Sequence, residues 1–122
     1  MNKNMNILAL AYLGDSIYEV YVRRYLLSKH IEKVNELQKE ATKYVSAKGQ
    51  ASYLQMLIDN NLLTEEERSV VNRARNHKSH AAPKNTDIIT YKYATGLEAL
   101  IGYLYVDNKK DRIDEIMNYI LK

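Results

Sequence analysis

The sequence contains no cysteine, tryptophan or phenylalanine, and only one proline and four glycines in 122 residues. Without cysteine there is no disulfide framework, no thiolate metal site and no thiol nucleophile, which fits a cytoplasmic protein. With so little proline and glycine, and no low-complexity tract, the sequence shows no linker between domains. We therefore expect one domain, spanning residues 1–122.

Long hydrophobic runs are also missing. A run such as ILALAYL is far shorter than the about 20 residues that a membrane-spanning helix needs, and the MNKNMN start does not resemble a signal peptide. We expect no membrane partner. Neither charge sign dominates, since 18 basic and 15 acidic residues give a net charge of +3. This balance permits a polyanionic partner without requiring one, so the distribution of charge matters more than its sum.

What the sequence does contain is helical periodicity. Apolar residues recur every three or four positions, the spacing of helices with one face in a core. This pattern predicts an all-α fold with helices at about residues 5–28, 33–45, 46–60, 64–76, 88–106 and 111–122. The junction at residue 46 is either a bend or part of one continuous helix. Thr64 and Glu67 form a capping-box pattern, and Asn85, Thr86 or Asp87 caps the helix that starts at residue 88.

The first helix carries an acidic residue beside its most apolar turn. Its predicted core face consists of Leu10, Leu13, Ile17, Val20 and Tyr21. Gly14 interrupts this helix at a cost of about 1 kcal/mol relative to alanine, which needs a reason such as close approach of another backbone. Asp15 follows at once. A carboxylate in such surroundings lies at an exposed edge, is paired with a basic residue, or binds a cation.

Glu98 repeats this situation in the helix at residues 88–106, whose predicted buried residues are Ala94, Leu97, Ile101 and Leu104. If the two helices cross, Asp15 and Glu98 converge at one point. Their oxygens would then suit Mg²⁺ or Mn²⁺, with waters completing the shell. Alternatively, the two acids face different solvent edges or pair with lysine and arginine, and spacing alone leaves this open.

The segment 72–86, NRARNHKSHAAPKNT, lacks any large aliphatic side chain. It is either a solvated surface loop or a basic loop that lies along nucleic-acid phosphates. In the second case, the candidate RNA-binding residues are Arg73, Arg75, Asn76, Lys78, Lys84 and Asn85. His77 and His80 have no further ligands nearby in the sequence, so we do not expect a zinc site.

Three segments resemble the ribonuclease III family. LALAYLGDSIYEVYVR is similar to its signature segment, with a pattern near NERLEFLGDAVL, and TGLEALIGYLYVD resembles its second metal-binding segment. The run RARNHKSHAAPKNTD, followed by TYKYAT, and the length without a double-stranded RNA-binding domain resemble the compact bacterial branch of that family.

The resemblance implies an all-helical endonuclease domain that forms a homodimer around a valley for double-stranded RNA. It implies Mg²⁺-dependent hydrolysis, with Mn²⁺ as a substitute, that leaves a 5′-phosphate and a 3′-hydroxyl. By position, Asp15 and Glu98 match the family's catalytic metal ligands. The substrate would be the ends of precursor large-subunit ribosomal RNA, with a ribosomal protein as a possible partner that presents the RNA.

The sequence also departs from the family pattern. Fuller members place carboxylates where this chain has Leu8, Ala11 and Thr95, which implies a less charged metal site with more water ligands. Glu19, one turn beyond Asp15, is a candidate to support the metal ligands from behind, and Thr95 is another. Tyrosine supplies all eleven aromatic residues; we expect most at core edges and interfaces, with Tyr91 or Tyr93 as candidates to touch RNA.

Two alternatives remain, the first based on these missing acids and the second on Asp15 and Glu98 as surface acids. One is a non-catalytic double-stranded RNA-binding or ribosome-assembly protein on the same fold, which would bind RNA without cutting it. The other is a helical interaction module without salt-dependent affinity for RNA.

Overall fold

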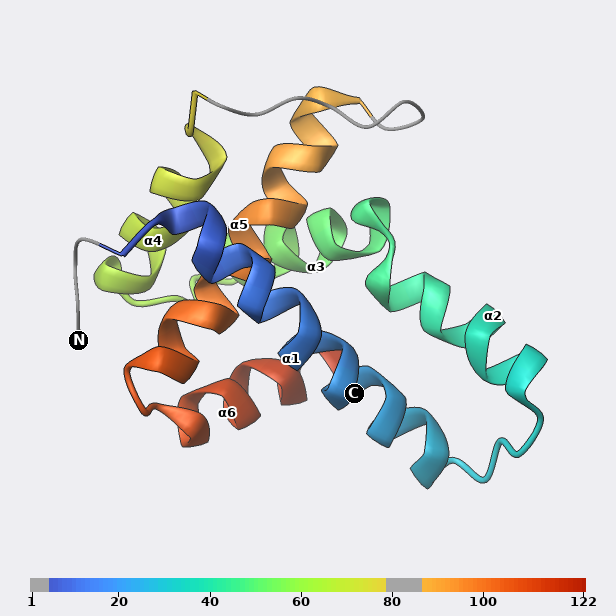
Figure 1. Cartoon of the computed structure of the whole chain (residues 1–122). Helices are drawn as coiled ribbons and strands as arrows, with labels where there is room; N and C mark the ends of the chain where they lie inside the picture. The colour runs from blue at the N-terminus through green and yellow to red at the C-terminus, as the bar shows by residue number, and fades with distance from the viewer. Residues whose placement is uncertain (1–4, 79–86) are drawn as a thin grey trace.

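The computed structural model describes residues 5–78 and 87–122, and over these residues the chain is entirely helical (Figure 1). The helices are α1 (Ile7–Ser28), α2 (Val34–Val45), α3 (Ala47–Asp59), α4 (Glu65–Arg75), α5 (Ile88–Val106) and α6 (Lys110–Leu121). The predicted all-α fold is confirmed, with helix ends close to those expected. No helix of this described part is long and apolar enough to cross a membrane.

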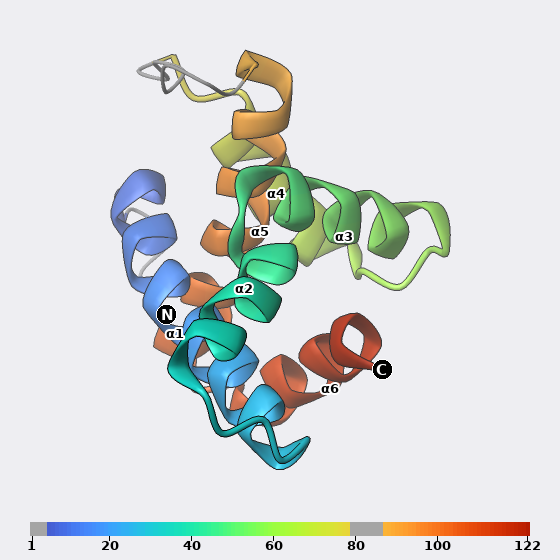
Figure 2. The same ribbon diagram turned by 90° about the vertical axis from the view of Figure 1, so that its right-hand side faces the viewer.

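Helices α1 and α5 form the centre of the fold. They share the most extensive contact in the molecule, and α5 also packs against α3, α4 and α6. Helix α2 lies against α1 and α3 instead, and the two views show it beside the C-terminal half of α1 (Figures 1 and 2). The α1–α5 crossing therefore positions most of the remaining helices.

Two glycines allow this crossing. A Cβ atom added to Gly14 would lie 1.7 Å from the carbonyl oxygen of Glu98, and one added to Gly102 would lie 1.9 Å from that of Leu10. Both contacts are to backbone, which has no side chain that could move aside. The close approach of another backbone at Gly14, predicted from the sequence, is confirmed.

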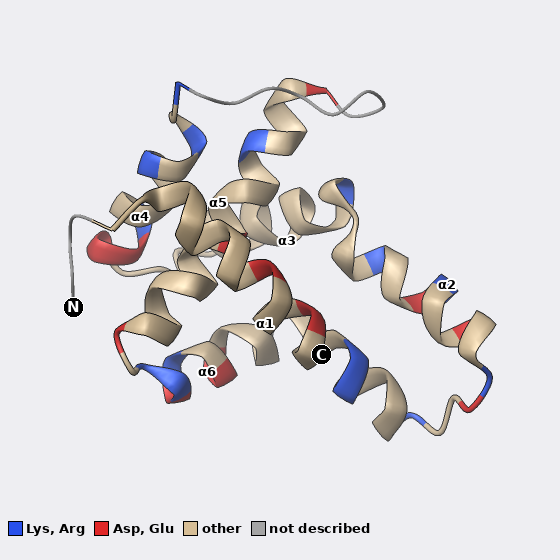
Figure 3. Ribbon diagram, in the orientation of Figure 1, with Lys and Arg blue, Asp and Glu red and all other residues tan. Residues whose placement is uncertain are grey.

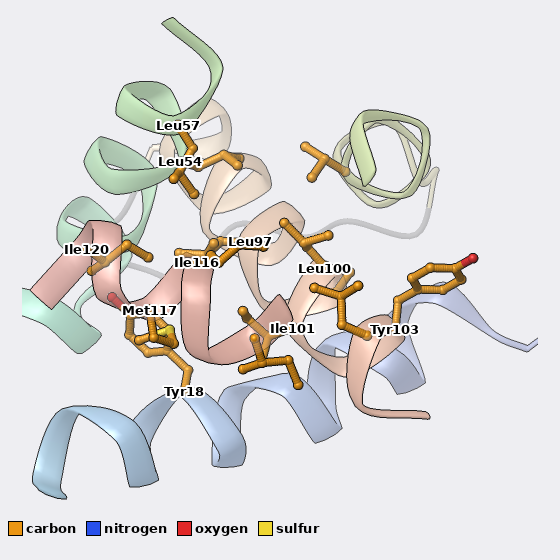
Figure 4. Close-up of a cluster of buried hydrophobic side chains, with 14 of the residues drawn as sticks. Tyr18, Leu54, Leu57, Leu97, Leu100, Ile101, Tyr103, Ile116, Met117 and Ile120 are labelled. Carbon is orange, nitrogen blue, oxygen red and sulfur yellow. The ribbon is translucent and has the colours of Figure 1, made fainter. Parts of the chain in front are cut away.

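The core face of α1 differs from the predicted one. Val20 is 60% exposed, so its assignment to the core was wrong, whereas Tyr18 and Val22 are completely buried. The reason is that α1 is apolar on more than one side, and its crossing with α5 selects the side that carries Gly14 and Tyr18. Leu10 is buried as predicted, and Figure 4 shows Tyr18 within the core cluster.

Helix α5 is buried over almost its whole second half. The four predicted core positions are all buried, namely Ala94, Leu97, Ile101 and Leu104. Leu100 and Ala99 are buried as well, because α5 is covered by helices on several sides. A carboxylate on this part of α5 is therefore set among apolar side chains.

The helix ends are built as the local sequence indicates. The side chain of Thr64 accepts a hydrogen bond from the Glu67 backbone N–H, and Glu67 accepts one from Thr64 in return, which confirms the capping box. Asp87 caps α5. Ser46 ends α2 and caps α3 at once, so the junction left open by the sequence is a bend.

Candidate active site

Asp15 and Glu98 meet where α1 crosses α5. Gly14 touches the backbone carbonyl of Glu98, so Asp15, the next residue, is brought beside the Glu98 carboxyl, within hydrogen-bonding reach of it. Asp15 is exposed and Glu98 is half-buried, so the pair lies at the edge of the core with one member open to solvent. Of the arrangements that the sequence left open, the structure shows convergence.

The surroundings of Glu98 disfavour its negative charge. Burial is the largest cause that raises the pKa of Glu98 to about 8, and the hydrogen bond and charge of Asp15 raise it further. In the described part of the chain, no lysine or arginine forms an ion pair with either carboxylate. Within this part of the chain, the pair is therefore stabilised by a proton on Glu98 or by an added cation, and not by a basic side chain.

This donor set fits a small divalent cation. Two adjacent carboxylates at the edge of the core offer the hard oxygen ligands that Mg²⁺ and Mn²⁺ prefer, usually together with several waters. Within residues 5–78 and 87–122 there is no cluster of three or more acidic, histidine or cysteine side chains that could hold a metal. Asp15 and Glu98 would thus be the protein ligands, and waters would complete the shell.

Gln50 is a third polar residue at this place, and the sequence analysis missed it. It lies on α3, is 2% exposed, and is close enough to Glu98 to oppose the other causes and lower its pKa. Its Nε2 nevertheless completes no hydrogen bond with any described residue. The spacing of Gln50 with Leu54 and Leu57 places it on the core face of α3, and this is the signal that could have found it.

The remaining residues predicted near the carboxylates have other contacts. Glu19 forms an ion pair with Arg23, 2.5 Å apart, on the surface of α1. Thr95 is buried, and its hydroxyl donates a hydrogen bond of 2.9 Å to the backbone carbonyl of Tyr91.

The positions of the missing family carboxylates are packed. Ala11 is buried, and Leu8 is half-buried against the core. Ala11 and buried Thr95 leave little room there for an additional charge.

The start of the basic segment 72–86 is the last turn of α4. Arg73, Asn76 and Lys78 are exposed, and Figure 3 shows basic residues at the end of α4 and near the start of α5. Arg75 is different, because its guanidinium lies 4.2 Å from the ring centroid of Tyr93 and its Nε is buried. The predicted residues Lys84 and Asn85 lie outside the described residues.

Comparison with known proteins agrees with this architecture. The pattern of the Ribonuclease III domain matches residues 8–109, a span that includes both carboxylates. A crystal structure of a protein from Fusobacterium nucleatum superposes with a TM-score of 0.86 at 33% identity, covering 97% of this chain and 94% of that one. The chain therefore belongs to the ribonuclease III family.

Its sequence relatives define the branch. Mini-ribonuclease 3 from Enterococcus faecalis is 50% identical over 120 residues, which cover 98% of this chain and 91% of that protein. Mini-ribonuclease 3 from Brevibacillus brevis is 52% identical, over 92% of this chain and 82% of that protein. Within the family, the chain groups with Mini-ribonuclease 3, and it is an endoribonuclease.

Proposed function

We propose that this endoribonuclease hydrolyses phosphodiester bonds of double-stranded RNA with a Mg²⁺ ion held by Asp15 and Glu98, and that Mn²⁺ can replace Mg²⁺. The observation that carries the proposal is the convergence of these two carboxylates at a glycine-mediated helix crossing, with no basic partner in the described part of the chain. The products would be a 5′-phosphate and a 3′-hydroxyl.

Asp15 and Glu98 would have different roles in the metal site. Asp15 is exposed, so an RNA phosphate can approach its side of the pair, whereas Glu98 is anchored in the core and fixes the position of the site. Glu98 must release its proton to serve as a ligand. When bound, the cation would supply an activated water and neutralise the charge that develops on the phosphate oxygens. The glycine contacts hold the carboxylates at a constant separation during this reaction.

The RNA would be bound mainly through its phosphates. Double-stranded RNA is recognised by shape, 2′-hydroxyls and phosphates, which a basic surface without base-reading residues suits. We propose that the segment 72–86 forms part of this surface. Arg73 and Lys78 support the proposal because both are exposed. The guanidinium of Arg75 is instead engaged with Tyr93, so Arg75 would orient the segment as well as add charge.

A homodimer would provide a surface long enough for a duplex. Tyr12, 86% exposed, and Val20, 60% exposed, are large apolar side chains on the same helix as Asp15, and burial against a second copy would remove them from water. Sedimentation analysis tests this proposal directly, because a monomer at micromolar concentration would contradict it.

The natural substrate we propose rests on the family resemblance. It is the double-stranded end region of precursor large-subunit ribosomal RNA in the cytoplasm, presented by a ribosomal protein. In this proposal, residues 1–122 act as one catalytic domain.

Cleavage of a long RNA duplex tests the metal site. Wild type should cut in Mg²⁺, whereas Asp15→Asn and Glu98→Gln should bind the duplex and cut at least about a hundredfold more slowly, because each loses one of two charged ligands. Asp59→Asn is the control, since Asp59 is an exposed acid that pairs with Gln55 on α3. Cleavage by both site variants at the wild-type rate would contradict the proposal.

A further inference from the structure

The buried amide of Gln50 lies at the edge of the proposed metal site. Gln50 occupies the same face of α3 as Leu54 and Leu57, both completely buried, so its side chain is directed into the molecule toward α5. There its side-chain amide lies within hydrogen-bonding reach of the Glu98 carboxyl and lowers the pKa of Glu98. A glutamine among leucines is costly unless its polar atoms are satisfied, which makes its position informative.

The bend between α2 and α3 fixes this position. The Ser46 side chain accepts a hydrogen bond of 3.1 Å from the Gly49 N–H, and its carbonyl accepts one of 2.9 Å from the Gln50 N–H. A Cβ atom on Gly49 would lie 2.2 Å from the carbonyl oxygen of Lys43, so the two helices meet tightly. The backbone that carries Gln50 therefore has little freedom.

The same bend is tied to the helix that carries Asp15. Tyr18 lies one turn after Asp15 on α1 and is completely buried, and its hydroxyl donates a hydrogen bond of 2.8 Å to the carbonyl of Tyr44 at the end of α2. Helix packing and this partly buried hydrogen bond thus hold α1, which carries Asp15, relative to the bend that carries Gln50. Such fixed geometry is what a metal site requires of its supporting residues.

The side-chain amide of Gln50 has an unsatisfied hydrogen-bond donor. Its Nε2 is buried and has no hydrogen-bond partner among the described residues. An amide nitrogen donates two hydrogen bonds and accepts none, so its partner is an acceptor oxygen, and a carboxylate is the strongest such acceptor. The carboxyl group of Glu98 is within hydrogen-bonding reach of this amide.

We propose that Gln50 is a positioning residue of the metal site, whose side-chain amide holds the Glu98 carboxylate in the orientation in which it binds the cation together with Asp15. This inference rests on the proposed function, because it assumes that Asp15 and Glu98 are the metal ligands. Gln50 itself touches neither RNA nor the reacting phosphate. It acts through Glu98.

The test is the affinity for Mn²⁺, measured by the electron paramagnetic resonance signal of the free ion. Gln50→Met keeps the length and removes the amide, and it should weaken Mn²⁺ binding about tenfold, the usual effect of losing a hydrogen bond to a metal ligand. In Mg²⁺-dependent cleavage, kcat should fall while KM for the duplex stays within about twofold, since Gln50 is buried away from the RNA. Leu54→Met, a volume-conserving change one turn along α3, is the matched control and should bind Mn²⁺ as wild type does.

The outcomes separate the two proposals. If Asp15→Asn weakens Mn²⁺ binding but Gln50→Met does not, the role of Gln50 is overturned and the metal site stands. If Asp15→Asn leaves Mn²⁺ affinity unchanged, the proposed function itself fails.

A measurement on wild type avoids any folding defect of the variants. The side-chain amide resonances of Gln50 should shift when Mg²⁺ is added, and they should stay in place in Asp15→Asn. Resonances that do not move in wild type at saturating Mg²⁺ would overturn the inference.

Discussion

Glu67 and Glu98 are both acidic residues set among packed helices, and their surroundings are opposite. Glu67 is 5% exposed, and its carboxylate accepts hydrogen bonds of 2.8 Å from Nε and from Nη2 of Arg112. It also accepts the Thr64 backbone N–H. Burial raises the pKa of Glu67, but these donors outweigh burial and hold it below the ordinary value. For Glu98, burial and Asp15 both raise the pKa, to about 8.

The difference separates a carboxylate with a counter-charge inside the chain from the carboxylate that we propose as a metal ligand. The charge of Glu67 is balanced within the chain, where Arg112 also binds the carbonyl of Leu62 and so ties α6 to the start of α4. At Glu98 the neighbouring group is another acid, so the stabilising charge must be a proton or an added cation. Burial alone therefore does not distinguish the two acids, and the counter-charge within the chain does.

The largest effect is expected from breaking the crossing that creates the acidic pair. Gly14→Ala would drive a methyl group into the backbone of Glu98, and we expect a loss of about 3 kcal/mol or more in the free energy of unfolding, together with loss of RNA cleavage. Urea denaturation measures the first and a duplex cleavage assay the second.

Gly96→Ala is the matched control on α5. Its added Cβ atom would lie 3.2 Å from side-chain atoms of Arg75 and Val71, which can shift, so the change in stability should stay within about 1 kcal/mol. A Gly14→Ala protein as stable as wild type would show that the helices do not approach this closely.

Removing the counter-charge of Glu67 should affect stability and leave catalysis intact. Arg112→Ala leaves a buried carboxylate without its partner, and we expect a loss of about 2–3 kcal/mol in the free energy of unfolding, given that Arg112 is 21% exposed. Cleavage by the folded variant, assayed well below its melting temperature, should match wild type.

Arg23→Ala provides the surface comparison. It breaks an exposed ion pair with Glu19 and should change stability by about 0.5 kcal/mol or less. Equal losses for the two arginine variants would remove the distinction between the buried and the exposed pair.

The pH dependence of stability should reveal the same ion pair. Because the pKa of Glu67 is lower in the folded state than its ordinary value of 4.5, its contribution is complete above that value and is lost as the pH falls through the folded pKa. The destabilisation caused by Arg112→Ala should therefore be largest at neutral pH and shrink in acid. Urea denaturation of wild type and Arg112→Ala from neutral to acidic pH measures this stability difference. A difference that stays constant with pH would contradict the ion pair between Glu67 and Arg112.

The smallest effects are expected from single basic residues near the RNA. Arg73→Ala or Lys78→Ala should each lower the slope of log affinity against log salt concentration by about 1, because each removes one phosphate contact. Binding of an RNA duplex measured over a range of salt concentrations tests this. Lys33→Ala is the control, because Lys33 is an exposed lysine before α2, and it should leave the slope unchanged. An unchanged slope for Arg73→Ala and Lys78→Ala as well would show that the segment 72–86 does not bind RNA.

Much of the fold follows from local sequence. The capping box at Thr64, the helix start at Asp87 and the close contact at Gly14 were all predictable because each depends on a few neighbouring residues. The exposed side of α1 was not, since Val20 and Val22 are equally apolar and only the crossing with α5 decides which is buried. Periodicity identifies a helix better than it identifies the buried face of a helix that is apolar all round.

The candidate site likewise contains features that the sequence predicts and features that depend on helix packing. The sequence predicted Asp15 and Glu98 as a pair on the condition that their helices cross, and the structure supplies that condition. The spacing of Gln50 with Leu54 and Leu57 indicates its burial, but its proximity to Glu98 depends on a bend at Ser46 that the sequence left open. The engagement of Arg75 with Tyr93 likewise joins two helices that the sequence does not place side by side.

The most direct test of the central claim is a crystal structure of the protein grown with Mn²⁺, with data collected to show the anomalous signal of the metal. The account predicts an anomalous peak within about 2.0–2.4 Å of carboxylate oxygens of both Asp15 and Glu98. If the protein cleaves RNA at that Mn²⁺ concentration and the crystal shows no peak between these carboxylates, the assignment of the metal site is wrong.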